Sequence, residues 1–147
     1  MESITASEQT VKVFLKEYPY AKLYKVAKQP TLICEATKEY IPIEDFIEMF
    51  EDMGDMVALL NIEKFIFDKR AMKTFHQPSM EWYFVTWKED LYRYGLKVHR
   101  KILPKDLGWF EEAVKAGRAK IEQDFPDFDI TRFDIQYRDS IEEAINS

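Results

Sequence analysis

The stretch Ile62-Glu63-Lys64-Phe65-Ile66-Phe67-Asp68 decides the fold that we predict for this chain. It is short and rich in aromatic and β-branched residues, which favours a strand. One helical pattern ends before it, at Leu60-Asn61, and another begins after the loop 69–77. A strand between two helices is typical of a sheet covered by helices, so we expect it inside the sheet. Asp68 then marks its carboxyl end, where open α/β sheets bind ligands.

Both flanking helical patterns are amphipathic. The first runs from about Pro42 to Leu60 and contains Gly54, which weakens a helix by about 1 kcal/mol relative to alanine and which a close approach of the helix to the sheet would explain. The second is expected over 78–94, with Gly95 as its C-terminal cap. Its apolar stripe comprises Met80, Tyr83, Phe84, Trp87, Leu91 and Tyr94. The side chains expected to face outward are Glu81, Lys88, Glu89 and Arg93.

The rest of the chain predicts one α/β domain over 10–147, after a polar, flexible N-terminus at 1–9. Further strands are expected at 10–15, 20–27, 31–37, 96–103 and 129–137, and further helices at 107–125 and 141–146. Short links make the early strands antiparallel, whereas strands separated by helices need crossovers and are parallel. We therefore predict a mixed β-sheet of four to six strands, with an antiparallel front half and about four helices packed against it.

The charge, the cysteine count and the lack of long apolar runs exclude several classes of function and location. The net charge of −6 argues against a nucleic-acid partner, because phosphate contacts need a basic face. The single cysteine, Cys34, permits no internal disulfide and is typical of a reducing compartment. The N-terminus lacks the apolar core of a signal peptide, and no run reaches the roughly 20 apolar residues of a membrane helix. We expect a cytoplasmic protein without a membrane span. The many aromatic residues predict a bulky core or, alternatively, a pocket or partner surface lined by aromatic side chains.

The sequence contains no strong catalytic signature. Its four glycines are isolated, so no phosphate-binding loop is predicted. Cys34, His76 and His99 share no metal-ligand spacing, and we expect neither a metal nor a cofactor. His76 and Ser79 lie close together, but Ser79 is equally explained by its preference for a helix start. Asp68 is expected to cap the loop that follows it and, alternatively, to bind a ligand.

One family resemblance follows from element order and short motifs. Its segments are the strand Phe65-Ile66-Phe67-Asp68, helix 78–94, Leu103-Pro104-Lys105-Asp106, Phe133-Asp134 and Arg138-Asp139-Ser140-Ile141-Glu142-Glu143-Ala144. Residues 20–146 thereby resemble the SpoIIAA-like domains of the bacterial STAS/Sec14-like group, common in Bacteroidetes. The resemblance implies a mixed sheet packed against helices. It also implies a switch serine at the start of the helix after the central strand, whose phosphorylation controls binding to a kinase. That place falls near Gln77-Pro78-Ser79, although the usual Asp-Ser-Ser-Gly run is absent.

Two functions are weighed ahead of an enzyme. The first is a non-enzymatic protein-interaction or regulatory module, with a protein partner or a second copy of the chain. Its surface would be the corner formed by Asp68, Arg70, Lys73, Thr74 and Ser79, where two cations lie in an otherwise acidic protein. The second is a binder of a small apolar or lipid-like ligand through an aromatic-lined pocket. Its lining would include Tyr83, Phe84 and Trp87.

Overall fold

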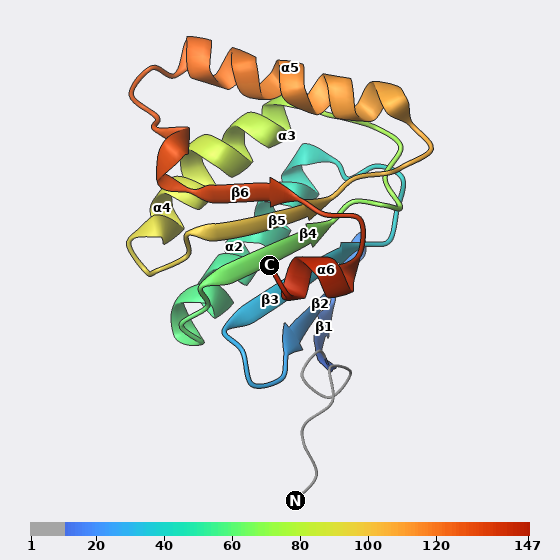
Figure 1. Cartoon of the computed structure of the whole chain (residues 1–147), viewed down its shortest axis with the longest axis vertical. Coiled ribbons are helices and arrows are strands. Elements are labelled where there is room, and N and C mark those ends of the chain that lie inside the picture. The colour runs from blue at the N-terminus through green and yellow to red at the C-terminus, as the bar shows by residue number, and fades with distance from the viewer. Residues whose placement is uncertain (1–10) are drawn as a thin grey trace, which may run out of the picture.

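The computed structural model describes residues 11–147, so the N-terminus predicted to be flexible lies outside the described residues. One six-stranded sheet runs in the order β1-β2-β3-β4-β5-β6 (Figure 1). Its strands are β1 (Lys12–Glu17), β2 (Ala21–Val26), β3 (Thr31–Ala36), β4 (Lys64–Asp68), β5 (Val98–Ile102) and β6 (Asp134–Tyr137). The first three strands pair antiparallel, and β3 to β6 pair parallel. The predicted α/β class and the mixed sheet with its antiparallel front half are confirmed.

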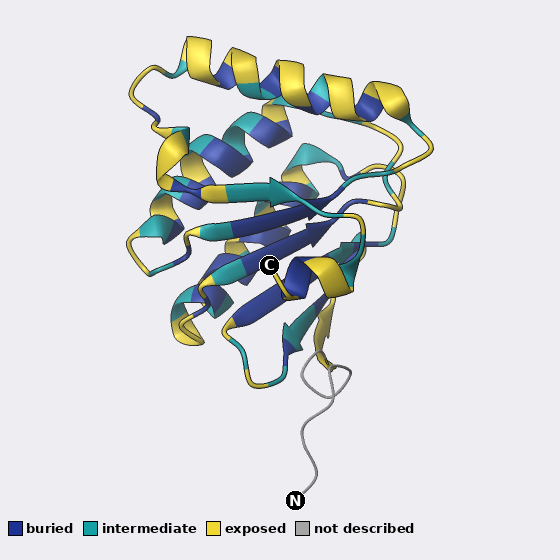
Figure 2. Ribbon diagram, in the orientation of Figure 1, coloured by how far each residue is buried: buried dark blue, intermediate teal, exposed yellow. Residues whose placement is uncertain are grey.

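Strand β4 lies inside the sheet, as predicted, between β3 and β5. Phe65 and Phe67 point to the face covered by the long helices, and Ile66 points to the opposite face. All three side chains are almost fully buried. Figure 2 shows β4 and β5 buried along most of their length, in contrast to the exposed edge strand β1. Burial on both faces explains why β4 reads as a continuous apolar run.

Helices cover the two faces unequally. One face carries α2 (Ile43–Leu59), α3 (Gln77–Glu81), α4 (Glu89–Tyr92) and α5 (Gly108–Asp124), and α6 (Ile141–Ile145) lies on the other (Figure 1). Gly54 of α2 is explained by a close approach, but to another helical segment rather than to the sheet. A Cβ at this position would lie 3.2 Å from Nε1 of Trp87 and 3.6 Å from Cδ1 of Leu91.

The predicted helix 78–94 is interrupted in the middle. A π-helical segment, η1 (Trp82–Lys88), joins α3 to α4. In a helix bonded from residue i to i+5, residues four and five positions apart share a face. Lys88 therefore shares the inward face with Tyr83 and Phe84 and is fully buried. The prediction that Lys88 faces outward was wrong because it assumed ordinary α-helical spacing.

The last predicted strand is also shorter than expected. Within 129–137, residues Ile130–Arg132 form a 3-10 turn, and only Asp134–Tyr137 pair with β5. The Asp129 side chain accepts a hydrogen bond from the backbone N–H of Thr131 at 3.0 Å. This local bond gives the backbone an alternative to the strand ladder, so the extended segment begins after it.

Candidate functional site

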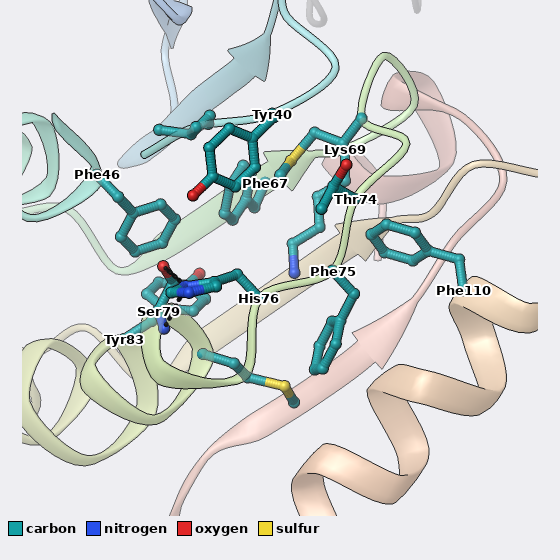
Figure 3. Close-up of a pocket in the computed structure, with 13 residues that line it drawn as sticks. Tyr40, Phe46, Phe67, Lys69, Thr74, Phe75, His76, Ser79, Tyr83 and Phe110 are labelled. Atoms are coloured by element: carbon teal, nitrogen blue, oxygen red, sulfur yellow. Dashed lines mark hydrogen bonds between the residues drawn. The ribbon is translucent and has the colours of Figure 1, made fainter. Parts of the chain in front are cut away.

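A cavity opens at the carboxyl end of β4 (Figure 3). Its wall combines the end of β4, the segment before α2, the loop before α3, α3 itself, the start of the π segment and single residues of α2 and α5. The lining residues are Tyr40, Ile41, Phe46, Phe67, Lys69, Met72, Thr74, Phe75, His76, Ser79, Met80, Tyr83 and Phe110. Tyr40 and Thr74 are exposed at its mouth. The inner space measures about 30 Å³, enough for roughly two water molecules or one small polar group.

The packing of α5 against α3 closes the far side of this cavity. Gly117 of α5 makes that contact possible, because a Cβ there would lie 2.8 Å from Cζ of Phe75 and 3.0 Å from Sδ of Met80. The side chain of Gln77 donates a hydrogen bond of 3.2 Å to the Gly117 carbonyl. Phe110, in the first turn of α5, then reaches the cavity wall and packs edge-on against Phe75.

Lys69 supplies the charge of the cavity. Its backbone N–H donates to the Ile102 carbonyl at 2.8 Å, which fixes the chain immediately after β4. Figure 3 shows its side chain reaching into the cavity, and its Nζ lies 4.9 Å from the centre of the Phe67 ring. The residue is only 7% exposed. Within residues 11–147 its Nζ has neither a hydrogen-bond acceptor nor an acidic partner. Burial lowers the pKa of Lys69 to about 8, against a small opposing effect of Cys34.

Further polar groups lie buried behind the cavity. Nζ of Lys88 and Nζ of Lys101 lie 3.6 and 4.0 Å from the centre of the same Phe84 ring. Neither amine has a hydrogen-bond partner within the described chain, and neither does the hydroxyl of Tyr83, which lines the cavity. Burial lowers the pKa of both amines well below the usual lysine value. Lys88 lowers the pKa of Lys101 further, whereas the contact with Lys101 raises that of Lys88. Burial also raises the pKa of Tyr83, so its hydroxyl keeps its proton.

Asp68 and Arg70, two members of the predicted corner, bind each other. The Asp68 carboxylate accepts hydrogen bonds from the Arg70 backbone N–H at 3.1 Å, from Nε at 3.0 Å and from Nη2 at 2.7 Å. Asp68 therefore caps the loop, as its position after the strand predicted. Lys73 pairs with Glu39 at 3.1 Å on the surface. Arg70 and Lys73 thus each have an acidic partner. These partners offset the local positive charge that motivated the predicted interaction corner.

Ser79 belongs to the wall of the cavity rather than to an open surface. It is 6% exposed, and its hydroxyl lies 2.8 Å from Nδ1 of His76. The same nitrogen accepts the Ser79 backbone N–H at 3.4 Å, which makes His76 the N-cap of α3. The pair therefore explains the start of the helix. Of the predicted corner, Thr74 and Ser79 reach the cavity, whereas Asp68, Arg70 and Lys73 do not line it.

The aromatic residues proposed as a ligand face are mainly core residues. Phe84 and Trp87 are almost fully buried, and Trp87 donates its indole N–H to the Phe50 carbonyl at 2.5 Å. Only Tyr83 of the three lines the cavity. Sequence reasoning missed Lys69, although its place directly after the central strand was a usable signal. Lysine is normally exposed, so nothing in the sequence indicated that this one points inward.

Residues 11–147 contain neither a cluster of metal ligands nor a membrane-spanning helix. No three His, Cys, Asp or Glu side chains of residues 11–147 come together as a set of metal ligands. No helix in the same part of the chain has the length and apolar character needed to cross a bilayer. Comparisons with protein-family models, with curated proteins and with solved structures find no match to the chain.

Proposed function

We propose that this protein is a non-enzymatic module that binds a small organic anion with an apolar body. One observation carries the proposal: the Lys69 amine lies in an apolar cavity without an acidic partner among the described residues. The anionic head would occupy the inner space beside Lys69. The apolar body would lie at the mouth against Tyr40, Met72 and Phe75.

Electrostatics supports an anion in this place. An unpaired ammonium group in an apolar site is unfavourable, and a bound carboxylate would restore a charge-assisted hydrogen bond. Low dielectric strengthens such a bond when water is excluded. Because the anion favours protonated Lys69, whose pKa in the free protein is about 8, affinity should be constant below that pH and fall above it.

The proposal keeps the regulatory role suggested by the SpoIIAA-like resemblance. An antiparallel front half followed by parallel strands, with helices mostly on one face, supports that architecture. The loop that carries Arg70 and Lys73 also contributes Met72 and Thr74 to the cavity wall. A protein partner that contacts this loop would therefore sense whether the cavity is occupied.

Hexanoate is a suitable probe for the test, measured by isothermal titration calorimetry at neutral pH. Lys69→Met should weaken binding roughly tenfold to a hundredfold, because a hydrogen bond to a charged group is lost. Lys73→Met is the matched control, since Lys73 is exposed and lies outside the cavity, and it should bind like the wild type. Hexanol, which lacks the charge, should bind more weakly than hexanoate. The proposal fails if hexanoate does not bind the wild type, or if Lys69→Met binds it equally well.

A further inference from the structure

We propose that Lys69 also captures aldehydes covalently, as an imine, at the mouth of the same cavity. The aldehyde would place its carbonyl carbon at Nζ and its apolar body against Tyr40 and Phe75. This inference rests on the proposed function only for the position of the apolar body, because the covalent step depends on the amine itself.

The surroundings of Lys69 make its amine available as a nucleophile. Most surface lysines are protonated and hydrated, whereas Lys69 is buried among apolar and aromatic side chains. A lysine desolvated in a hydrophobic pocket is one of the established ways to activate an amine toward carbonyl compounds. The lowered pKa of about 8 means that a substantial fraction of the side chain is neutral near that pH.

The groups that face Lys69 do not restore its charge. Cys34 of β3 lies near enough to raise its pKa slightly. Lys88 of η1 and Lys101 of β5 offer no negative charge to it, and Lys69 lowers the pKa of both as a like charge. The other titratable residues that line the cavity are Tyr40, His76 and Tyr83. Asp68 precedes Lys69 in the chain, but its carboxylate is bound to Arg70.

The step balances without any redox partner. The nitrogen lone pair of neutral Lys69 forms a bond to the carbonyl carbon, and the carbonyl oxygen takes up one proton, giving a carbinolamine. Loss of the second nitrogen proton and protonation of the hydroxyl then release one water molecule and leave the C=N bond. Within the proposed step, we assign the Tyr83 hydroxyl as a hydrogen-bond donor to the departing oxygen, because Tyr83 lines the same cavity and its hydroxyl has no hydrogen-bond partner in the described chain.

Reductive trapping tests this inference. The full-length protein is incubated with a limiting amount of hexanal and sodium cyanoborohydride at about pH 8, and labelled peptides are identified by mass spectrometry. Hydride addition to the imine leaves a hexyl group on the modified lysine. Lys69 should label at least about tenfold faster than the exposed Lys73, because burial lowers the pKa of Lys69 to about 8 and so raises its neutral fraction. Lys69→Arg should abolish the fast label, whereas Lys73→Arg should retain it.

Two further measurements separate covalent capture from simple binding. Tyr83→Phe keeps the ring in the core and removes only the hydroxyl, so it should slow labelling at Lys69 without unfolding the protein. Excess hexanoate should slow the same label by competing for the cavity. The inference is overturned if Lys69 labels no faster than Lys73 in the folded wild type. If hexanoate still binds in that case, the proposed function stands alone. If Lys69 labels fast but hexanoate does not bind, covalent capture stands and anion binding fails.

Discussion

Nζ of Lys88 lies 3.6 Å from the centre of the Phe84 ring, in the interior of the protein. The two residues lie four positions apart in the π-helical segment between α3 and α4, and both point inward. A cation above an aromatic ring is normally favourable. Here burial, aided by Lys69 and Arg118, lowers the pKa of Lys88 well below its usual value. Desolvation therefore outweighs the attraction of the ring and favours the neutral amine.

Replacing this lysine with an apolar side chain of similar length should stabilise the protein. Lys88→Met removes a buried amine that has no hydrogen-bond partner among the described residues. We expect the free energy of unfolding at neutral pH to rise by about 1–3 kcal/mol, the usual cost of an unsatisfied buried polar group. Urea unfolding measures the change. Lys115→Met on the exposed side of α5 is the control and should stay within about 0.5 kcal/mol. A destabilised Lys88→Met would show that the amine makes a favourable interaction.

Lys69 should make stability depend on pH in a defined window. Its pKa is about 8 when folded and near the usual 10.5 when unfolded. Between these values the unfolded state binds more protons, so the free energy of unfolding gains a contribution that rises with pH. The free energy of unfolding of the wild type minus that of Lys69→Met should therefore increase by about 1.4 kcal/mol per pH unit in that window. Below the window this difference should not change with pH. Titratable groups that do not interact with Lys69 act in both proteins and cancel in the difference. A flat difference above pH 8 would place the Lys69 amine in water.

The interior position of β4 predicts a large cost for truncating Ile66. This side chain is fully buried on the face covered by α6, where it packs with Ile33 and Ile102. Ile66→Ala should lower the free energy of unfolding by about 2–5 kcal/mol in denaturant titration. Leu59→Ala is the matched control, because Leu59 is 78% exposed at the end of α2. A loss below about 1 kcal/mol at Ile66 would contradict a central strand with both faces covered.

The Asp68–Arg70 pair should matter more than the nearby surface pair. Asp68 is nearly buried and accepts one backbone and two guanidinium hydrogen bonds, whereas Glu39 and Lys73 are both mostly exposed. We expect Asp68→Ala to cost about 1.5–3 kcal/mol and Glu39→Ala to cost less than about 1 kcal/mol. Thermal and urea unfolding of the two variants give the comparison. Equal effects would mean that the Asp68 contacts are as loose as the exposed ion pair.

The layout of the fold follows from local sequence. The apolar run of β4, the amphipathic spacing of α2 and the short links between the first strands predict an interior strand and an antiparallel front half. These features depend on periodicity and loop length, which neighbouring residues set by themselves. The role of Asp68 as a cap was predictable for the same reason, since its backbone contact lies two residues away.

Only the tertiary structure decided where the charged side chains point. Lys69, Lys88 and Lys101 lie in segments that read as ordinary polar or solvent-facing sequence, yet all three are buried. Their burial depends on the π-helical turn, on the parallel neighbours of β5 and on α5 closing over the cavity. Each of these arises from contacts between segments far apart in the chain, and local periodicity carries no record of them. The candidate site is therefore a product of packing, built on a strand whose position the sequence alone predicts.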